Sequence, residues 1–125
     1  MKWLIAESYI LLLWVGAILA FRNLHVLCKQ VQNAQTKVNQ SGSQRDAEKL
    51  CRAMELACIF FPSQVLCLQR SAATTLLLRR HGIRAELVIG AQLMPFRSHA
   101  WVESDGTVVN DKPYMREIYQ VLEHC

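Results

Sequence analysis

The sequence lacks the patterns that several classes of site require. It has no CxxC pair, and its nearest approach to a zinc motif is a single His25-x-x-Cys28. Its basic residues are scattered, with no Arg/Lys stripe that carries interleaved aromatics, and the net charge is only +4. We therefore expect no metal, no other cofactor and no nucleic-acid partner.

Internal repeats and strongly biased segments are also missing, and 125 residues allow one core but not two. The five cysteines are an odd number in a chain too long to need disulfide staples. This favours free thiols in a reducing compartment, so we expect a cytoplasmic protein.

The N-terminal segment 3–21 is strongly apolar, but Glu7 interrupts it and leaves a clean run of only Ile10 to Phe21. Runs of that length are more typical of a core helix than of a membrane span. No small-x-small cleavage site follows cleanly, as a signal peptide would need. We expect a buried core helix, with membrane association and a signal segment as the alternatives.

Residues 22–42 turn Gln/Asn-rich, with apolar side chains at helical spacing, and form either an exposed helical continuation or a connector. Ser43 followed by Asp46 predicts the start of another helix. An apolar stripe runs along that helix and carries Cys51 and Cys58, which we interpret as small buried hydrophobes.

Pro62 ends that helix, and Ser63 is placed to cap the next one, over roughly 64–80. This helix is apolar over most of its circumference, which predicts a place in the core. After Gly82 the pattern changes to strands at 85–91, 98–103 and 107–110, and the tail 113–125 is a short helix or an irregular end. Helices followed by a small antiparallel sheet predict an α+β fold.

Cys67 differs from the other cysteines because it falls near the start of the buried helix. Backbone N–H groups and the positive end of the helix dipole favour thiolate there, and thiolate is the form that attacks a carbonyl carbon. His99 begins an otherwise apolar strand, where an imidazole needs partners, and it can act as the base. Another buried core thiol is the plain alternative for Cys67.

Asp111 follows from turn geometry. A three-residue loop Ser104-Asp105-Gly106 would pair Glu103 with Thr107 and place His99 opposite Asp111, with Cβ atoms about 4.5–5.5 Å apart. A two-residue Asp105-Gly106 loop would instead pair His99 with Lys112 and turn Asp111 to the other face. In the first register the carboxylate can orient the imidazole, which completes a Cys-His-Asp triad.

Several motifs together resemble the lasso-peptide leader peptidases, transglutaminase-like cysteine proteases of bacterial lasso-peptide biosynthesis. The resemblance covers residues 62–111, about 40% of the chain. It rests on Cys67-Leu68-Gln69-Arg70-Ser71, Leu77-Leu78-Arg79-Arg80-His81-Gly82-Ile83, Leu87-Val88-Ile89-Gly90, Pro95-Phe96, His99-Ala100-Trp101-Val102-Glu103 and Asn110-Asp111. It implies a papain/transglutaminase-like fold with Cys67 as nucleophile, His99 as base and Asp111 as orienting residue.

The resemblance also implies a single peptidase domain over 1–125, with a helical part (1–61) and a catalytic core (62–111). Its reaction would remove the leader from a ribosomally made precursor, before a separate ATP-dependent cyclase uses the freed amine. Residues 1–60 read as helices without the family's strand-bearing recognition domain, so we expect the split form, which depends on a separate leader-recognition protein. An acyltransferase with the same triad and a non-catalytic precursor-binding scaffold are the alternatives. For the oxyanion, the Cys67 N–H and the Gln64 side chain are candidate donors.

Overall fold

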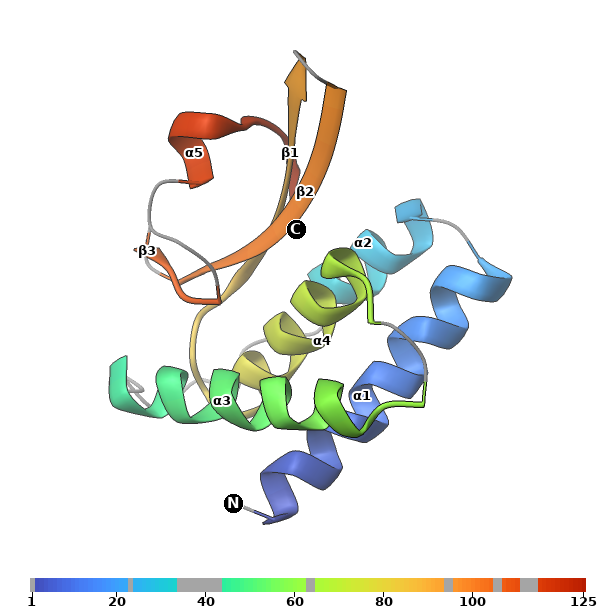
Figure 1. Cartoon of the computed structure of the whole chain (residues 1–125), viewed down its shortest axis with the longest axis vertical. Coiled ribbons are helices and arrows are strands. Elements are labelled where there is room, and N and C mark those ends of the chain that lie inside the picture. Colours follow the sequence, from blue (N-terminus) through green and yellow to red (C-terminus); the bar gives the residue numbers. More distant parts are fainter. Residues whose placement is uncertain are drawn as a thin grey trace.

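A computed structural model describes residues 2–22, 24–33, 44–62, 65–93, 96–104, 107–110 and 115–125. Its first half contains α1 (Lys2–Phe21), α2 (Leu24–Asn33), α3 (Gln44–Phe60) and α4 (Cys67–Arg80). Its second half contains β1 (Glu86–Leu93), β2 (Phe96–Ser104), β3 (Thr107–Val108), α5 (Met115–Ile118) and β4 (Gln120–His124). The long helices gather on one side of the sheet (Figure 1), so the predicted α+β fold is confirmed.

The sheet has the strand order β3-β2-β1-β4, with every neighbouring pair antiparallel. In the central pair, Gly90 of β1 lies opposite His99 of β2. The sequence did not predict β4. Its five residues lie in a tail that shows no strand pattern, and they pair with β1, which is distant along the chain. The ladder closes at Cys125, whose N–H and carbonyl both bond to Leu87, at 2.8 and 2.7 Å.

α4 occupies the centre of the molecule, as its sequence predicts. Its residues from Ser71 to Leu78 are all buried, and it packs against β2 through Ala100 and Val102. The helix begins at Cys67 rather than near 64. Its N-cap is Leu66, and the expected cap Ser63 lies outside the described residues. The later start places Cys67 at the first helical position.

α1 packs against α3 and α4, and polar contacts hold it to both ends of α4. Near the end of α4, Arg80 and His81 contact the Glu7 carboxylate at 2.7 and 3.2 Å. Near its start, the buried Gln69 amide donates to the Leu12 carbonyl at 2.9 Å. Glu7, the residue that interrupts the apolar segment, is therefore explained by its ion pair with α4.

The outward side of α1 is apolar and exposed, with Trp3 and Phe21 both 87% accessible. By length and composition alone α1 could cross a membrane, although only 22% of its most apolar window is buried within the protein. The prediction of a buried core helix is therefore correct for only one side of α1. Leu11, Leu12 and Val15 enter the core, whereas Ile10, Leu13 and Trp14 face outward.

Candidate active site

Cys67 is half-buried and packs against the main hydrophobic core. The N-cap Leu66 has an extended backbone and makes no side-chain capping bond, and the first helical bond joins Arg70 N–H to Leu66 carbonyl at 3.0 Å. Amide groups at the start of a helix have no intrahelical acceptor, and a leucine side chain cannot supply one. The first turn of α4, which begins at Cys67, therefore offers N–H donors and a positive dipole end.

The other cysteines are less suited to nucleophilic chemistry. Burial, aided by the nearby Glu55 carboxylate, raises the pKa of the Cys51 thiol to about 11. Burial also raises the pKa of Cys58. Cys28 and Cys125 are 3% and 5% exposed, and none of the five cysteines forms a disulfide. The interpretation of Cys51 as a buried small hydrophobe is confirmed, while Cys58 is only half-buried.

His99 is half-buried in β2, and its ring lies against two aromatic side chains. The Trp101 ring centroid is 6.2 Å away in a stacked orientation, and the Tyr119 centroid is 5.4 Å away at an angle of 30°. These two ring contacts help to hold the imidazole in one orientation.

Gly90 makes room for this aromatic group. A Cβ added at Gly90, directly opposite His99, would fall 2.7 Å from Trp101 Cη2 and 2.8 Å from Tyr119 Cβ. Contacts below 3.0 Å require a neighbour to move, and both neighbours here are parts of packed aromatic residues. The glycine is thus required by the close approach of Trp101 and Tyr119 to β1.

Glu103 lies two residues beyond Trp101 on β2 and is only 4% exposed. Its carboxylate accepts a bond of 2.8 Å from the Trp101 indole and two bonds, of 2.7 and 2.8 Å, from the Arg116 guanidinium. Burial by itself would raise the pKa of Glu103, but the bonds from Arg116 and Trp101 outweigh it and hold the pKa below its ordinary value.

A hydrogen-bond network, buried at Ser71 and part-buried at Asn110, joins α4 to the His99 strand. The Ser71 hydroxyl, one helical turn after Cys67, donates to the carbonyl of Ala100 at 3.0 Å. Asn110 donates its amide to Ser71 at 3.1 Å and accepts the Val102 N–H at 2.7 Å. These bonds bring the first turn of α4 alongside the segment of β2 that begins with His99.

The two side chains have different described surroundings within this shared region. Cys67 packs against the main core, whereas the His99 ring lies against Trp101 and Tyr119. The Ser71–Ala100 bond thus brings the backbones that carry Cys67 and His99 close together. The His99 side chain, however, lies on the face of β2 that carries Trp101, whereas α4 packs on the opposite face, at Ala100 and Val102.

The register argument that placed Asp111 opposite His99 is wrong. Glu103 pairs with Val108 and Ser104 with Thr107, which is the register of a two-residue loop rather than of the preferred three-residue one. This register leaves two residues between the paired ends of the strands, a loop length for which Asp-Gly is a favoured sequence. β3 ends at Val108, so its pairing does not extend to Asp111, which lies outside the described residues together with Gln64. The role of Asp111 stays a prediction that rests on the resemblance.

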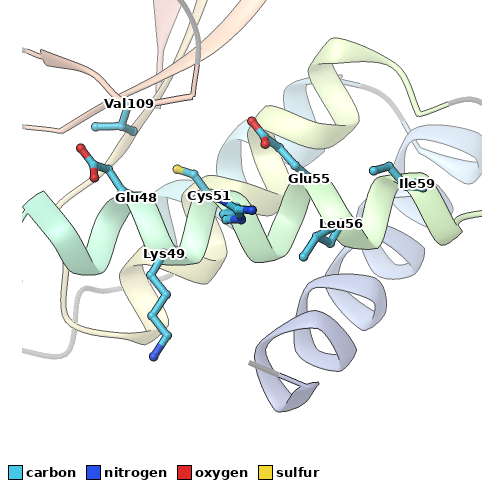
Figure 2. Close-up of a pocket in the computed structure, with 8 residues that line it drawn as sticks. Glu48, Lys49, Cys51, Glu55, Leu56, Ile59 and Val109 are labelled. Carbon is cyan, nitrogen blue, oxygen red and sulfur yellow. The ribbon is translucent and has the colours of Figure 1, made fainter.

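A cavity of about 770 Å³ lies along α3 and reaches Val109 (Figure 2). Its described lining includes Cys51, together with side chains of both charges such as Glu48 and Lys49, but neither Cys67 nor His99. Across the described ranges, no group of three His, Cys, Asp or Glu residues could hold a metal ion.

Comparison with known proteins identifies the class. The family model for the transglutaminase-like superfamily matches residues 10–124, so the chain belongs to that superfamily. It is also 46% identical, over 56 residues, to the microcin J25-processing protein McjB of Escherichia coli. That match covers 45% of this chain and 27% of the relative, so the chain spans about a quarter of the protein that it matches. No solved structure matches the chain.

Proposed function

We propose that this protein is a cysteine peptidase that removes the leader from a ribosomally made lasso-peptide precursor. The observation that carries the proposal is the position of Cys67 at the uncapped start of α4, joined through Ser71 and Ala100 to the His99 strand. The similarity to a protein named for microcin J25 processing supports a precursor peptide as the substrate.

In the proposed reaction, His99 takes the proton of the Cys67 thiol, and the thiolate attacks the carbonyl carbon at the leader–core junction. The N–H groups of the first turn of α4, with that of Cys67 first among them, stabilise the negative oxygen that forms. His99 then protonates the amine of the core peptide as the C–N bond breaks. This step leaves the leader bound to Cys67 as a thioester.

Water completes the cycle. His99 removes a proton from a water molecule, the resulting hydroxide attacks the thioester, and the released Cys67 thiolate regains a proton from the imidazolium. The products are a free leader acid and a core peptide with a new N-terminal amine. Asp111 completes the proposal as the carboxylate that orients the imidazole.

The partners and location belong to the same proposal. A separate leader-recognition protein holds the precursor and raises the local concentration of the scissile bond, and an ATP-dependent lasso cyclase consumes the core peptide. Five cysteines without a disulfide suit a cytoplasmic location. The exposed apolar side of α1 is the feature that makes membrane association the alternative.

The test is incubation of the purified chain with precursor and recognition protein, followed by mass spectrometry of the products. Cys67→Ala and His99→Ala are expected to abolish leader removal, and Asp111→Ala to leave weak activity, since losing an orienting group costs less than losing the nucleophile. Cys51→Ala is the matched control and is expected to retain activity. Full cleavage by Cys67→Ala would disprove the proposal.

Acyl transfer to an amine is the second candidate, because the chain belongs to a transglutaminase-like superfamily. Both reactions share the thioester step and differ only in whether water or an amine attacks it. Adding a primary amine to the same incubation distinguishes them. A leader fragment that carries the added amine would identify a transferase, and an unmodified leader acid supports the peptidase.

A further inference from the structure

We infer that Glu103 is a positioning residue for the His99 imidazole, because its one carboxylate holds both aromatic side chains that the imidazole contacts. This inference rests on the proposed role of His99 as the base. It adds a function for the ion pair between the buried Glu103 of β2 and the half-exposed Arg116 of α5, which otherwise only joins two elements of the fold.

Trp101 is held directly. Its indole N–H donates to Glu103 Oε2 at 2.8 Å, and its side chain is completely buried. Residues two apart on a strand share a face, so His99, Trp101 and Glu103 form a row along one face of β2. The bond fixes the indole within that row, and the indole in turn stacks on the imidazole at 6.2 Å.

Tyr119 is held indirectly, through α5. Arg116 donates to both carboxylate oxygens of Glu103, and this two-point contact fixes the orientation of the guanidinium as well as its distance. The Tyr119 N–H donates to the Met115 carbonyl at 2.9 Å, so this hydrogen bond ties Tyr119 directly to the end of α5. Its ring lies 5.4 Å from the imidazole and 6.0 Å from the indole.

A helix of four residues has little stability of its own, so α5 depends on its tertiary contacts for its position. The Met115 side chain and the Glu103–Arg116 pair supply such contacts. Weakening the pair would free Tyr119 and loosen Trp101 at the same time. The imidazole would then lose the two aromatic contacts that help to orient it, while the backbone of β2 remains in place.

The test uses Glu103→Gln, which keeps the size of the side chain but cannot retain two charge-assisted bonds from Arg116. Glu117→Gln is the matched control, since Glu117 is an exposed carboxylate on the same short helix. Nuclear Overhauser contacts between the His99 ring protons and the rings of Trp101 and Tyr119 report orientation without any substrate. Kinetics of leader cleavage then report the effect on catalysis.

We expect Glu103→Gln to lose or weaken these ring contacts and to lower kcat about 10- to 100-fold with KM unchanged, because misplaced catalytic groups slow chemistry rather than binding. Glu117→Gln should change neither. Arg116→Lys, which keeps the charge but not the two-point contact, should give a smaller loss, and it carries the test if Glu103→Gln fails to fold.

Two results would overturn the inference: ring contacts that survive both substitutions, or lost contacts with an unchanged kcat. A wild-type protein that does not cleave the precursor would instead refute the proposed function. In that case the ring contacts still decide whether Glu103 positions His99.

Discussion

Asn110 and Ser71 share a hydrogen bond of 3.1 Å that connects the segment after β3 to the central helix. The Asn110 side chain also accepts the backbone N–H of Val102, at 2.7 Å. One amide therefore satisfies a strand donor and a helix hydroxyl together. It fixes the position of the residue immediately before Asp111, the predicted orienting carboxylate.

Asn110→Ala should lower the free energy of unfolding by about 1–3 kcal/mol, because it leaves the Val102 N–H without its acceptor in a part-buried position. Urea denaturation followed by circular dichroism measures the change. Thr107→Ala, at an exposed position on β3, is the control and should change stability by less than about 0.5 kcal/mol. Equal effects from the two substitutions would show that the Asn110 bonds contribute little.

Gly90→Ala should destabilise the protein by about 1–3 kcal/mol, because its new methyl group would meet Trp101 and Tyr119 within 3 Å. Gly16→Ala offers an informative comparison. The added methyl there meets only the terminal amide of Gln69, at 2.8 Å, and a flexible side chain can move away. The gain in helix propensity from glycine to alanine, about 1 kcal/mol, should offset much of the loss of the Gln69 bond. A Gly16 variant less stable than the Gly90 variant would contradict this reasoning.

The stabilising contribution of Glu103 should depend on pH in the acid range. Its pKa in the folded protein lies below the ordinary value of 4.5, so folding favours the ionised form. The contribution is complete above that ordinary value and is lost as the pH falls through the lower folded pKa. Urea titrations of wild type and Glu103→Gln between about pH 7 and about pH 3 should show a stability difference that shrinks toward acid. A difference that grows toward acid would mean that the neutral carboxyl is the preferred form.

Cys67 should react with iodoacetamide before the other cysteines of the native protein. With a pKa of about 11, Cys51 is thiolate in roughly one molecule in a thousand at about pH 8. Mass mapping of the alkylated peptides over time gives the order of reaction, and the fastest adduct should disappear in Cys67→Ala. If Cys51 is labelled as fast as Cys67, the assignment of the nucleophile from helix position is wrong.

The sequence predicted the features that depend on local pattern. The apolar circumference of α4 indicated a central helix, and the break at Pro62 indicated its approximate start. The strand pattern after Gly82 indicated the hairpin that carries His99. Prediction from the sequence failed for elements whose positions depend on partners far away in the chain. β4 and Tyr119 take their positions from β1 and from the Glu103–Arg116 pair, neither of which leaves a periodic signal in the tail.

The turn after Ser104 shows a second kind of limit. Both loop lengths are chemically reasonable, and they differ by one residue, which moves every partner in the pair of strands. The motif residues Trp101, Glu103 and Asn110 were visible in the sequence, but their bonds to Arg116 and Ser71 could not be read from it. Only the folded arrangement shows which partners those side chains have.

The contacts that hold α1 to α4 have a consequence during protein synthesis. Leu12 is synthesised 57 residues before its partner Gln69, and the delay between Glu7 and its partners Arg80 and His81 is longer still. At typical translation rates this interval is roughly 3–11 s, far longer than a helix needs to form. Throughout that time the inner side of this apolar helix lacks the part of its packing surface that α4 supplies. Until α4 is complete, that uncovered surface is open to aggregation and to capture by chaperones.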